Sequence, residues 1–371
     1  HRGKQVRMRH LFILVILTSL ANAAEQDFRG QLSLYGNAWK SNSIWYGGAG
    51  LQYIPNLQIT NALSDARSID FEASVYLYID NNSGEFSDDF KPYRLNLRYA
   101  TQQSEIQVGL QQINFGPAQL LRSLMWFDRK DPTDPLNFAE GVWGMRYRYY
   151  FLNNANIWTW GLLCNDTKGY ETMSSDKLMP EFGGRIQIPV PRGEVALTTH
   201  HRNIKMSGIR VEDTSNDLNY TDNRIALDGR WDIVVGAWFE TAIQKIKGSG
   251  IDRYTKMSTL GLDYTFGIGN GLYVLAEHMI TQTATELFKS DREYQFSAMM
   301  LNYPLGMFDT ISLMAFYSWQ TEDFIQYINW QRAYDNIAIN LALFHFPDTQ
   351  FSTINTMGCD IGFRLMIIYN H

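Results

Sequence analysis

Apolar and polar residues alternate in short segments along almost the whole chain, and this period of two constrains the fold more than any other feature. The segment SIDFEASVYLYID shows the pattern clearly. One set of alternating positions is apolar: Phe71, Ala73, Val75, Leu77 and Ile79. The other set is more polar: Asp70, Glu72, Ser74, Tyr76 and Tyr78. Because successive side chains of a β-strand point to opposite faces of its sheet, each such segment is predicted to be a strand with one apolar and one polar face.

About eighteen such segments follow one another, and each is roughly as long as a tilted strand must be to cross a bilayer. They lie at about 28–40, 45–61, 68–80, 92–101, 105–114, 141–151, 156–165, 181–190, 193–203, 223–231, 233–246, 256–266, 271–283, 293–303, 309–320, 324–333, 336–346 and 356–369. Connections after even-numbered segments are short, whereas those after most odd-numbered segments, the third included, are longer and more charged. This asymmetry predicts an all-β fold, a transmembrane antiparallel up-and-down β-barrel with short periplasmic turns and longer extracellular loops.

A soluble β-sandwich would also alternate apolar and polar positions, but the aromatic residues argue against it. Tryptophan and tyrosine collect near the expected strand ends: Trp39, Trp45, Tyr46, Tyr53, Trp143, Tyr149, Trp158, Trp160, Trp231, Tyr317, Trp319, Trp330 and Tyr369. Rings at strand ends are typical of the aromatic girdles at the two membrane interfaces. We therefore expect the apolar faces to contact outer-membrane lipid.

The N-terminal residues are not expected to belong to the barrel. Arg9 and His10 precede the apolar run LFILVILTSL, and Ala-Asn-Ala follows it. A basic start, a short apolar middle and an A-x-A end predict a secretory signal peptide at 8–23. No linker or repeat divides the rest, so residues 24–371 are expected to form one barrel domain.

Charge and cysteine content exclude several function classes. The formal net charge of -6 and the lack of a Lys/Arg-rich run after the signal peptide leave no surface suited to nucleic acid. Cys164 and Cys359 are far apart in sequence, form no CxxC zinc motif and are expected to be free thiols. No run approaches the roughly 20 apolar residues of a spanning helix, which excludes a polytopic helical membrane protein.

The polar faces are expected to point into the lumen, because a charge that faces the middle of the bilayer costs about 2–4 kcal/mol. This argument places eight arginines inside: Arg94, Arg98, Arg146, Arg148, Arg185, Arg224, Arg230 and Arg364. It also places six acids there: Asp70, Glu72, Asp228, Glu240, Asp263 and Asp360. The arginines concentrate on one side of the wall, where they could bind anionic groups through their planar forks. Alternatively, they pair with the lumen acids and stiffen the wall; both interpretations stay open.

The stretch FGPAQLLRSLMWFDRKDPTDP is predicted to fold into the lumen. Pro117 suits the first position of a short helix. Four apolar residues follow at helical spacing: Leu120, Leu121, Leu124 and Met125. Asp128, Arg129 and Asp131 come next and are expected to face the arginines across the lumen. Because opposed charges orient passing solutes, the loop at about 115–140 is a predicted constriction.

Catalytic and metal-binding interpretations are weaker. Asp128 and Asp131 could form an acid–base pair, but carboxylates in a loop broken by prolines commonly cap turns. His200 and His201 are adjacent, so on a strand they would point to opposite faces and could not ligate one metal ion together. No serine elbow indicates a hydrolase. The chain is not expected to be an enzyme, and no metal or cofactor is expected.

Residues 105–151 also resemble a known layout: a strand, the motif G-x-Q-x-x-x-F-G, a loop with D-P-x-D-P and an Arg-bearing strand. This layout is similar to that of Gram-negative porin-like barrels of the alginate-export type. The resemblance implies that an acidic polysaccharide passes through a loop-constricted pore. It implies as lining residues Arg94, Arg98, Arg146, Arg148, Asp128 and Asp131. The chain departs from such barrels at its end, where Asn370 and His371 follow Tyr369 in place of a terminal aromatic residue.

Together these features predict a porin-like outer-membrane channel for small anionic or polar solutes, with saccharides among the candidates. The residues expected at the lumen or its constriction are Arg94, Arg98, Arg146, Arg148, Arg185, Asp128, Arg129, Asp131, Asp70 and Glu72. The alternative is a non-conducting barrel that acts as an assembly or adhesion platform through extracellular loops near 167–180 and 204–222. Nothing in the sequence indicates an oligomeric state.

Overall fold

A computed structural model describes residues 25–136, 138–171, 173–205, 219–248, 251–347 and 361–371. The predicted signal peptide at 8–23, Cys359 and Asp360 lie outside these residues, as does most of the segment 204–222. The described chain folds into eighteen strands. It includes no helix that is long and apolar enough to cross a membrane.

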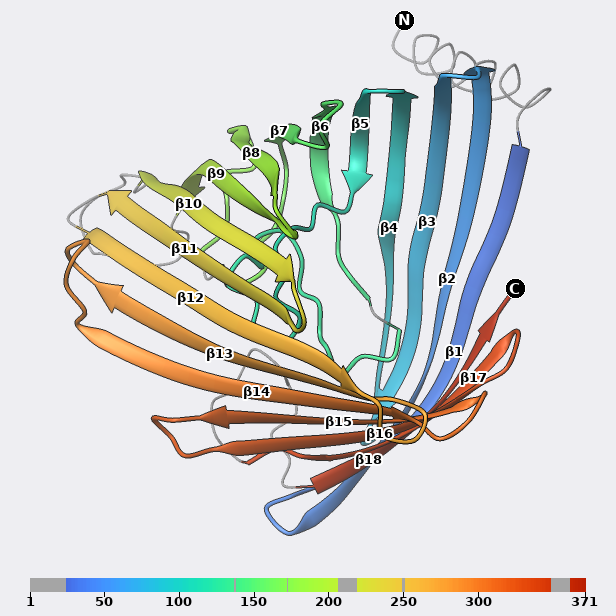
Figure 1. Cartoon of the computed structure of the whole chain (residues 1–371). Coiled ribbons are helices and arrows are strands. Elements are labelled where there is room, and N and C mark those ends of the chain that lie inside the picture. The colour runs from blue at the N-terminus through green and yellow to red at the C-terminus, as the bar shows by residue number, and fades with distance from the viewer. Residues whose placement is uncertain (1–24, 137, 172, 206–218, 249–250, 348–360) are drawn as a thin grey trace, which may run out of the picture.

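The strands alternate with turns and loops along the whole described chain (Figure 1). They are β1 (Glu25–Ser41), β2 (Ile44–Ser64), β3 (Arg67–Asn82), β4 (Glu85–Thr101), β5 (Ser104–Gln111), β6 (Val142–Tyr150), β7 (Asn156–Leu162), β8 (Glu181–Val190), β9 (Gly193–Lys205), β10 (Asn219–Asp232), β11 (Gly236–Gly248), β12 (Ile251–Phe266), β13 (Leu272–Ala284), β14 (Arg292–Pro304), β15 (Asp309–Ser318), β16 (Phe324–Ala333), β17 (Ile337–His345) and β18 (Ile361–Asn370). Each of them overlaps one predicted segment, so the predicted number of strands is confirmed.

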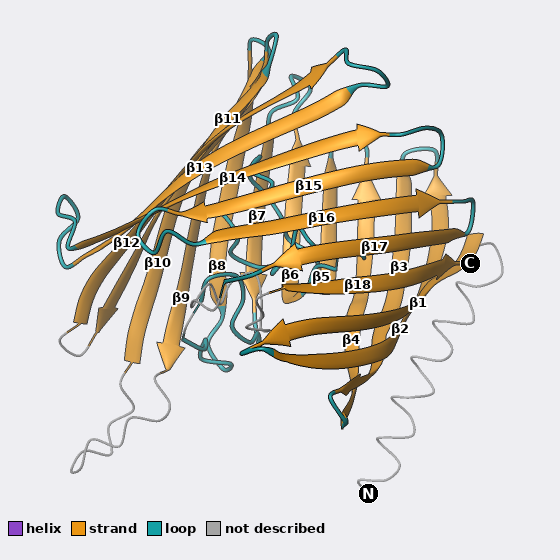
Figure 2. Ribbon diagram, turned by 90° about the horizontal axis from the view of Figure 1, so that it is seen from below, coloured by secondary structure: helices purple, strands orange, loops and turns teal. Residues whose placement is uncertain are grey.

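The strands form one closed antiparallel sheet. Each strand pairs with its neighbours in the sequence, and β1 also pairs with β18, from Gln31 opposite Asn370 to Lys40 opposite Ile361. The view from below in Figure 2 shows the strands arranged around the interior. Closure gives each of these strands a hydrogen-bonded partner on both sides, and a lipid environment requires this because it cannot satisfy free backbone groups. The predicted all-β barrel is confirmed.

The alternation of the sequence sets the two faces of this wall. On β17 and β18, Leu341 and Leu365 point outward with 40% and 45% of their surface exposed, whereas Asn340 and Met366 point inward and are buried. The outer face therefore carries the apolar band that contacts lipid, and the inner face carries the residues that can form a site.

The predicted long loop after the third strand is wrong. β3 and β4 are joined only by Ser83 and Gly84, which both have positive φ angles, as a tight two-residue hairpin turn requires. β4 begins at Glu85, well before the predicted start at 92. The segment between them, EFSDDFK, is mostly exposed, so its two faces lack the apolar contrast by which strands were recognised.

The predicted aromatic girdle is also partly wrong. Trp39, Trp158 and Trp160 are buried, at 7%, 9% and 4% exposure, in two clusters inside the barrel. Their positions near strand ends indicated an interface, but the parity of each strand decides which face a ring occupies. These three tryptophans therefore belong to the lumen.

The face assignment predicts how the barrel responds to a new charge. Leu341→Arg places a charge on the outer face at the middle of β17, and we expect it to lower the free energy of unfolding by about 2–4 kcal/mol. Gln52→Arg, on the inner face of β2, is the matched control and should cost less than about 1 kcal/mol. Denaturant titration in lipid vesicles measures both, and equal losses would contradict the assignment.

Candidate functional site

The connection between β5 and β6, residues 112–141, turns into the barrel and is called the inward loop below (Figure 1). The predicted helix at its start is wrong, since the described part of the loop has no helical residue. Its N–H groups bond instead to the barrel wall. The residues that gave the helical spacing are nevertheless buried: Leu120, Leu121, Leu124 and Met125.

Two buried glutamates on the wall anchor the inward loop. Glu240 on β11 accepts hydrogen bonds from the backbone N–H of Ala118, at 2.8 Å, and of Leu124, at 3.1 Å. Glu277 on β13 accepts three more, from consecutive residues 119, 120 and 121, at 2.5 to 2.9 Å. It also accepts one from the indole of Trp238, at 3.1 Å. Charge-assisted bonds of this kind are stronger than neutral ones, so five loop N–H groups are fixed to two points of the wall.

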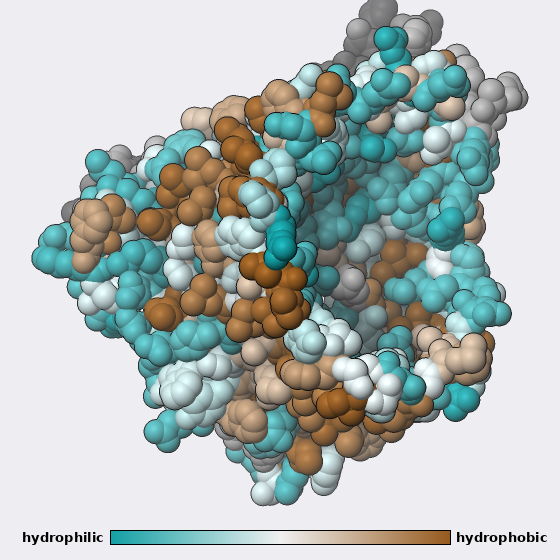
Figure 3. Space-filling view, viewed as in Figure 1, coloured by the Kyte–Doolittle hydropathy of each residue, from teal (hydrophilic) through white to brown (hydrophobic). Residues whose placement is uncertain are grey.

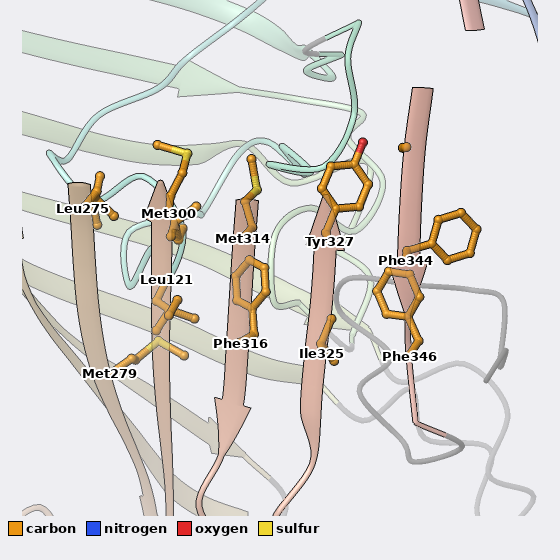
Figure 4. Packing of buried hydrophobic residues seen from close by; sticks show 14 of the residues in the cluster. Leu121, Leu275, Met279, Met300, Met314, Phe316, Ile325, Tyr327, Phe344 and Phe346 are labelled. Carbon is orange, nitrogen blue, oxygen red and sulfur yellow. The ribbon is translucent and has the colours of Figure 1, made fainter. Parts of the chain in front are cut away.

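Apolar contacts extend this anchoring on both sides. Leu120 and Leu121 pack on an apolar inner face that runs from β13 to β17, and Figure 4 shows Leu121 beside residues of that wall. That face includes Leu275, Met279, Met300, Met314, Phe316, Ile325, Tyr327 and Phe344. Phe115 and Phe127 pack against Trp160 of β7, and Trp126 packs against Phe115 in the same cluster. The inward loop thus covers the inner wall from β6 round to β17.

The carboxylates of the inward loop organise the loop itself. Asp128 does not face the arginine-bearing strands but forms a buried ion pair with Arg122, at 2.9 Å. Asp131 accepts hydrogen bonds from the N–H and the hydroxyl of Thr133, at 2.8 and 2.7 Å, and burial raises its pKa. Arg129 is exposed. These contacts are those of turn-capping residues.

The wall from β8 to β10 holds a buried network of ion pairs. Arg185 binds both carboxylate oxygens of Asp228, at 2.6 and 2.8 Å. Arg202 and Arg224 both form ion pairs with Asp222. They also share Glu171, which belongs to the loop between β7 and β8. This part of the segment 167–180 is therefore held inward against the wall.

Sequence reasoning missed Arg202, Glu277 and Glu181. Arg202 follows two histidines, and its inward side chain is evident only from its pairing opposite Asp222. Glu277 lies on β13, where each face mixes polar and apolar residues, so the strand gave no clear alternation. The register across strands, rather than any single segment, was the signal that could have found these residues.

Predicted residues on β3 to β6 form a second polar network around Glu105, which the sequence did not single out. Glu105 contacts three arginines: Arg98, Arg146 and Arg148, at 2.8, 3.4 and 3.3 Å. Asp70 pairs with Arg98 at 3.1 Å. These contacts support the second interpretation from the sequence, in which the arginines pair with lumen acids and stiffen the wall.

Two further predicted residues, Glu72 and Arg94, belong to this network. Within the part of the chain that the structure describes, neither forms an ion pair. Glu72 accepts hydrogen bonds from Asn56 and Asn96, both at 3.0 Å. Arg94 donates to the carbonyl of Ala139, at 2.8 Å, and so ties the inward loop to β4. Within this network four arginines therefore stand against three acids, and its charge is close to balanced.

The two networks differ in their access to solvent. The side chains of Arg98 and Asp70 are 41% and 25% exposed, whereas those of Arg185 and Asp228 are both 4% exposed. Figure 3 shows the molecule hollowed near the centre of this view, with hydrophilic residues gathered on the side where β1 to β4 lie. Water thus reaches Arg98 and Asp70 near one end of β3 and β4, whereas Arg185 and Asp228 on β8 and β10 are sealed.

The histidine pair behaves as strand geometry requires. His200 is buried among ring residues and lies 3.3 Å from Glu181, whereas His201 contacts Asn223 on the other face. Within the described residues, no group of three or more His, Cys, Asp or Glu side chains is arranged to hold a metal ion. Cys164 is an exposed free thiol in the loop after β7.

Comparison with known proteins points to one group of folds. The sequence matches no family model, and no curated protein is significantly similar to it. The structure is similar to that of OmpT, an outer membrane protein of Vibrio cholerae, with a TM-score of 0.55, 10% identity and coverage of 94% of this chain and 100% of that chain. It is similar to an anion-selective porin from Comamonas acidovorans, with a TM-score of 0.52, 12% identity and coverage of 94% and 100%.

A third similar structure is OccK5 (OpdH) of Pseudomonas aeruginosa, with a TM-score of 0.54, 13% identity and coverage of 93% of this chain and 98% of that chain. Each match extends over nearly the whole of both chains, so the likeness concerns the complete barrel rather than a local strand motif. The chain is therefore a porin-like barrel, with the fold by which Gram-negative porins lie in the outer membrane.

Proposed function

We propose that the protein is a channel for small polar solutes, anions and saccharides included, and that the inward loop is its constriction. The path lies between the inward loop and the inner face of β1 to β5. The observation that carries this proposal is the contrast in solvent exposure, because Arg98 and Asp70 are wet while Arg185 and Asp228 are sealed. An eighteen-stranded barrel is wide enough for an aqueous path even when a loop occupies part of it.

The charges along this path favour weak rather than strong anion preference. Each exposed arginine on β4 and β6 has an acidic partner, so little unpaired positive charge faces the solute. One structural neighbour is an anion-selective porin, which supports a channel for charged solutes without fixing its selectivity here. We infer that size and polarity select solutes more than charge does.

A non-conducting platform remains the alternative, and one observation favours it. The inward loop and its two apolar clusters occupy a large part of the interior. The hairpins that join β1 to β2 and β3 to β4 also expose large apolar side chains, including Trp45, Phe86 and Phe90. A partner could bind there without any solute passing through the barrel.

Conductance separates the two functions. The purified protein in a planar bilayer should produce discrete, stable current steps in potassium chloride. Deleting residues 118–127 from the inward loop should raise the single-channel conductance at least about twofold, because pore conductance grows with the open cross-section. A protein that is folded, as judged by circular dichroism, but silent in both forms would support the platform.

The anchoring glutamates give a second test. Glu240→Gln together with Glu277→Gln removes the charge of both acceptors but keeps their size, and neutral acceptors bind backbone N–H groups about half as strongly. We expect noisier currents with frequent transitions to a larger conductance, because the loop would leave the wall part of the time. Glu293→Gln, at an exposed glutamate on β14, is the control and should leave the current steady. Steady currents in the double variant would show that Glu240 and Glu277 do not hold the inward loop in place.

Reversal potentials in a salt gradient test the charge balance. Arg98→Gln removes an exposed positive charge from the path, and we expect the anion-to-cation permeability ratio to fall by about half. Arg192→Gln makes the same charge change in the exposed turn between β8 and β9, away from the path, and should not alter the ratio. Equal shifts in both variants would show that Arg98 does not line the path.

A further inference from the structure

Four aromatic rings form a continuous series on the solvent-accessible side of the barrel. The ring centroids of Tyr78 and Tyr76 are 5.5 Å apart, those of Tyr76 and Phe138 are 4.7 Å apart, and those of Phe138 and Tyr93 are 4.9 Å apart. The rings come from β3, the inward loop and β4. We call Tyr78, Tyr76, Phe138 and Tyr93 the aromatic track.

A β-bulge brings Tyr93 into this series. In the ladder between β3 and β4, Ser74 pairs with Arg94 and Val75 pairs with Pro92, so Tyr93 is the extra residue. Bulges re-aim a side chain that regular alternation would direct elsewhere. The guanidinium of Arg94 lies 3.9 Å from the centroid of the Tyr93 ring.

Loop contacts fix Phe138 against the wall. The carboxylate of Asp134 accepts a hydrogen bond from the Phe138 N–H, at 3.1 Å, and Arg94 donates to the carbonyl of the next residue, Ala139, at 2.8 Å. The two anchors hold the end of the inward loop beside β3 and β4. The ring of Phe138 therefore keeps its place between Tyr76 and Tyr93.

The track is not part of the buried core. All four rings are only partly buried, whereas the rings in the clusters around Leu121 and Phe115 are almost entirely enclosed. Polar groups flank the track, since the hydroxyl of Tyr35 donates to Asp80 at 3.1 Å and the amine of Lys91 lies 6.0 Å from the centroid of the Tyr78 ring. The arrangement combines flat apolar faces with hydrogen-bonding groups at their edges.

We propose that the aromatic track binds the pyranose rings of neutral oligosaccharides as they pass the inward loop. This inference rests on the proposed channel function and names its preferred solute class. A pyranose has a flat face of C–H groups that packs on an aromatic ring, and its hydroxyls need polar partners around the edge. The two cations that contact the track have partners, since Lys91 pairs with Asp89 at 2.9 Å and the buried Arg94 donates to the carbonyl of Ala139. This suits a neutral sugar, whereas an acidic one would require accessible cations without partners.

Maltohexaose is the probe, and current block in a planar bilayer is the first measurement. Millimolar maltohexaose should interrupt the wild-type current. Tyr76→Ala and Phe138→Ala should each weaken the apparent affinity about tenfold, because each removes the middle of the track. Phe86→Ala, at an exposed ring on the same hairpin, is the matched control and should leave the affinity unchanged. Circular dichroism and unchanged conductance without sugar verify that the variants fold.

Isothermal titration of maltohexaose into the detergent-solubilised protein tests binding independently of conductance. Binding that is lost in Tyr76→Ala supports the track, even if no current flows and the channel proposal fails. A conducting protein that neither binds maltohexaose nor is blocked by it would overturn the track and leave the channel intact. Block by an oligouronate but not by maltohexaose would also overturn it, since charge rather than ring stacking would then select the solute.

Discussion

The need to satisfy every backbone N–H and C=O group without water shapes the whole molecule. In the wall, closure of β1 on β18 meets this need for the strands that would otherwise be edges. In the interior, the same need determines how a loop without regular structure can be buried. Its N–H groups find acceptors in Glu240 and Glu277, two buried carboxylates of the wall. The barrel and its inward loop thus follow from one constraint.

Burying that loop has a consequence for the other charges of the lumen. Where the loops cover the wall, Arg185, Arg202 and Arg224 on β8 to β10 are enclosed and each has a carboxylate partner, because a buried charge without a partner is costly. On β3 and β4, Arg98 and Asp70 remain partly exposed, whereas Arg94, which contacts the end of the inward loop, is buried. Position relative to the inward loop, rather than residue type, therefore separates arginines that stabilise the wall from arginines that a solute can meet.

Local patterns were sufficient to predict the barrel but not its interior. Each of the eighteen segments read from the sequence corresponds to a strand, and most of them alternate because an apolar outer face and a more polar inner face run along the strand. Alternation failed at the start of β4, where residues from Glu85 onward are mostly exposed on both faces. It also failed on β13 to β17, where Leu275 and Met300 face inward and are apolar because the inward loop covers them. Such residues report a contact with a distant segment, and no local window contains that information.

The charge cluster around Asp128 shows the same limit. Its residue types were evident in the sequence, but the acceptors and donors that they use were not. Asp128 binds Arg122 within the loop, whereas the contact of the loop with β4 is made by Arg94 through a backbone carbonyl. The inward loop is consequently held at two places, by glutamates on β11 and β13 and by an arginine and aromatic rings on β3 and β4. A segment fixed at both sides of a lumen can narrow it without being rigid itself, because its position is set by the wall.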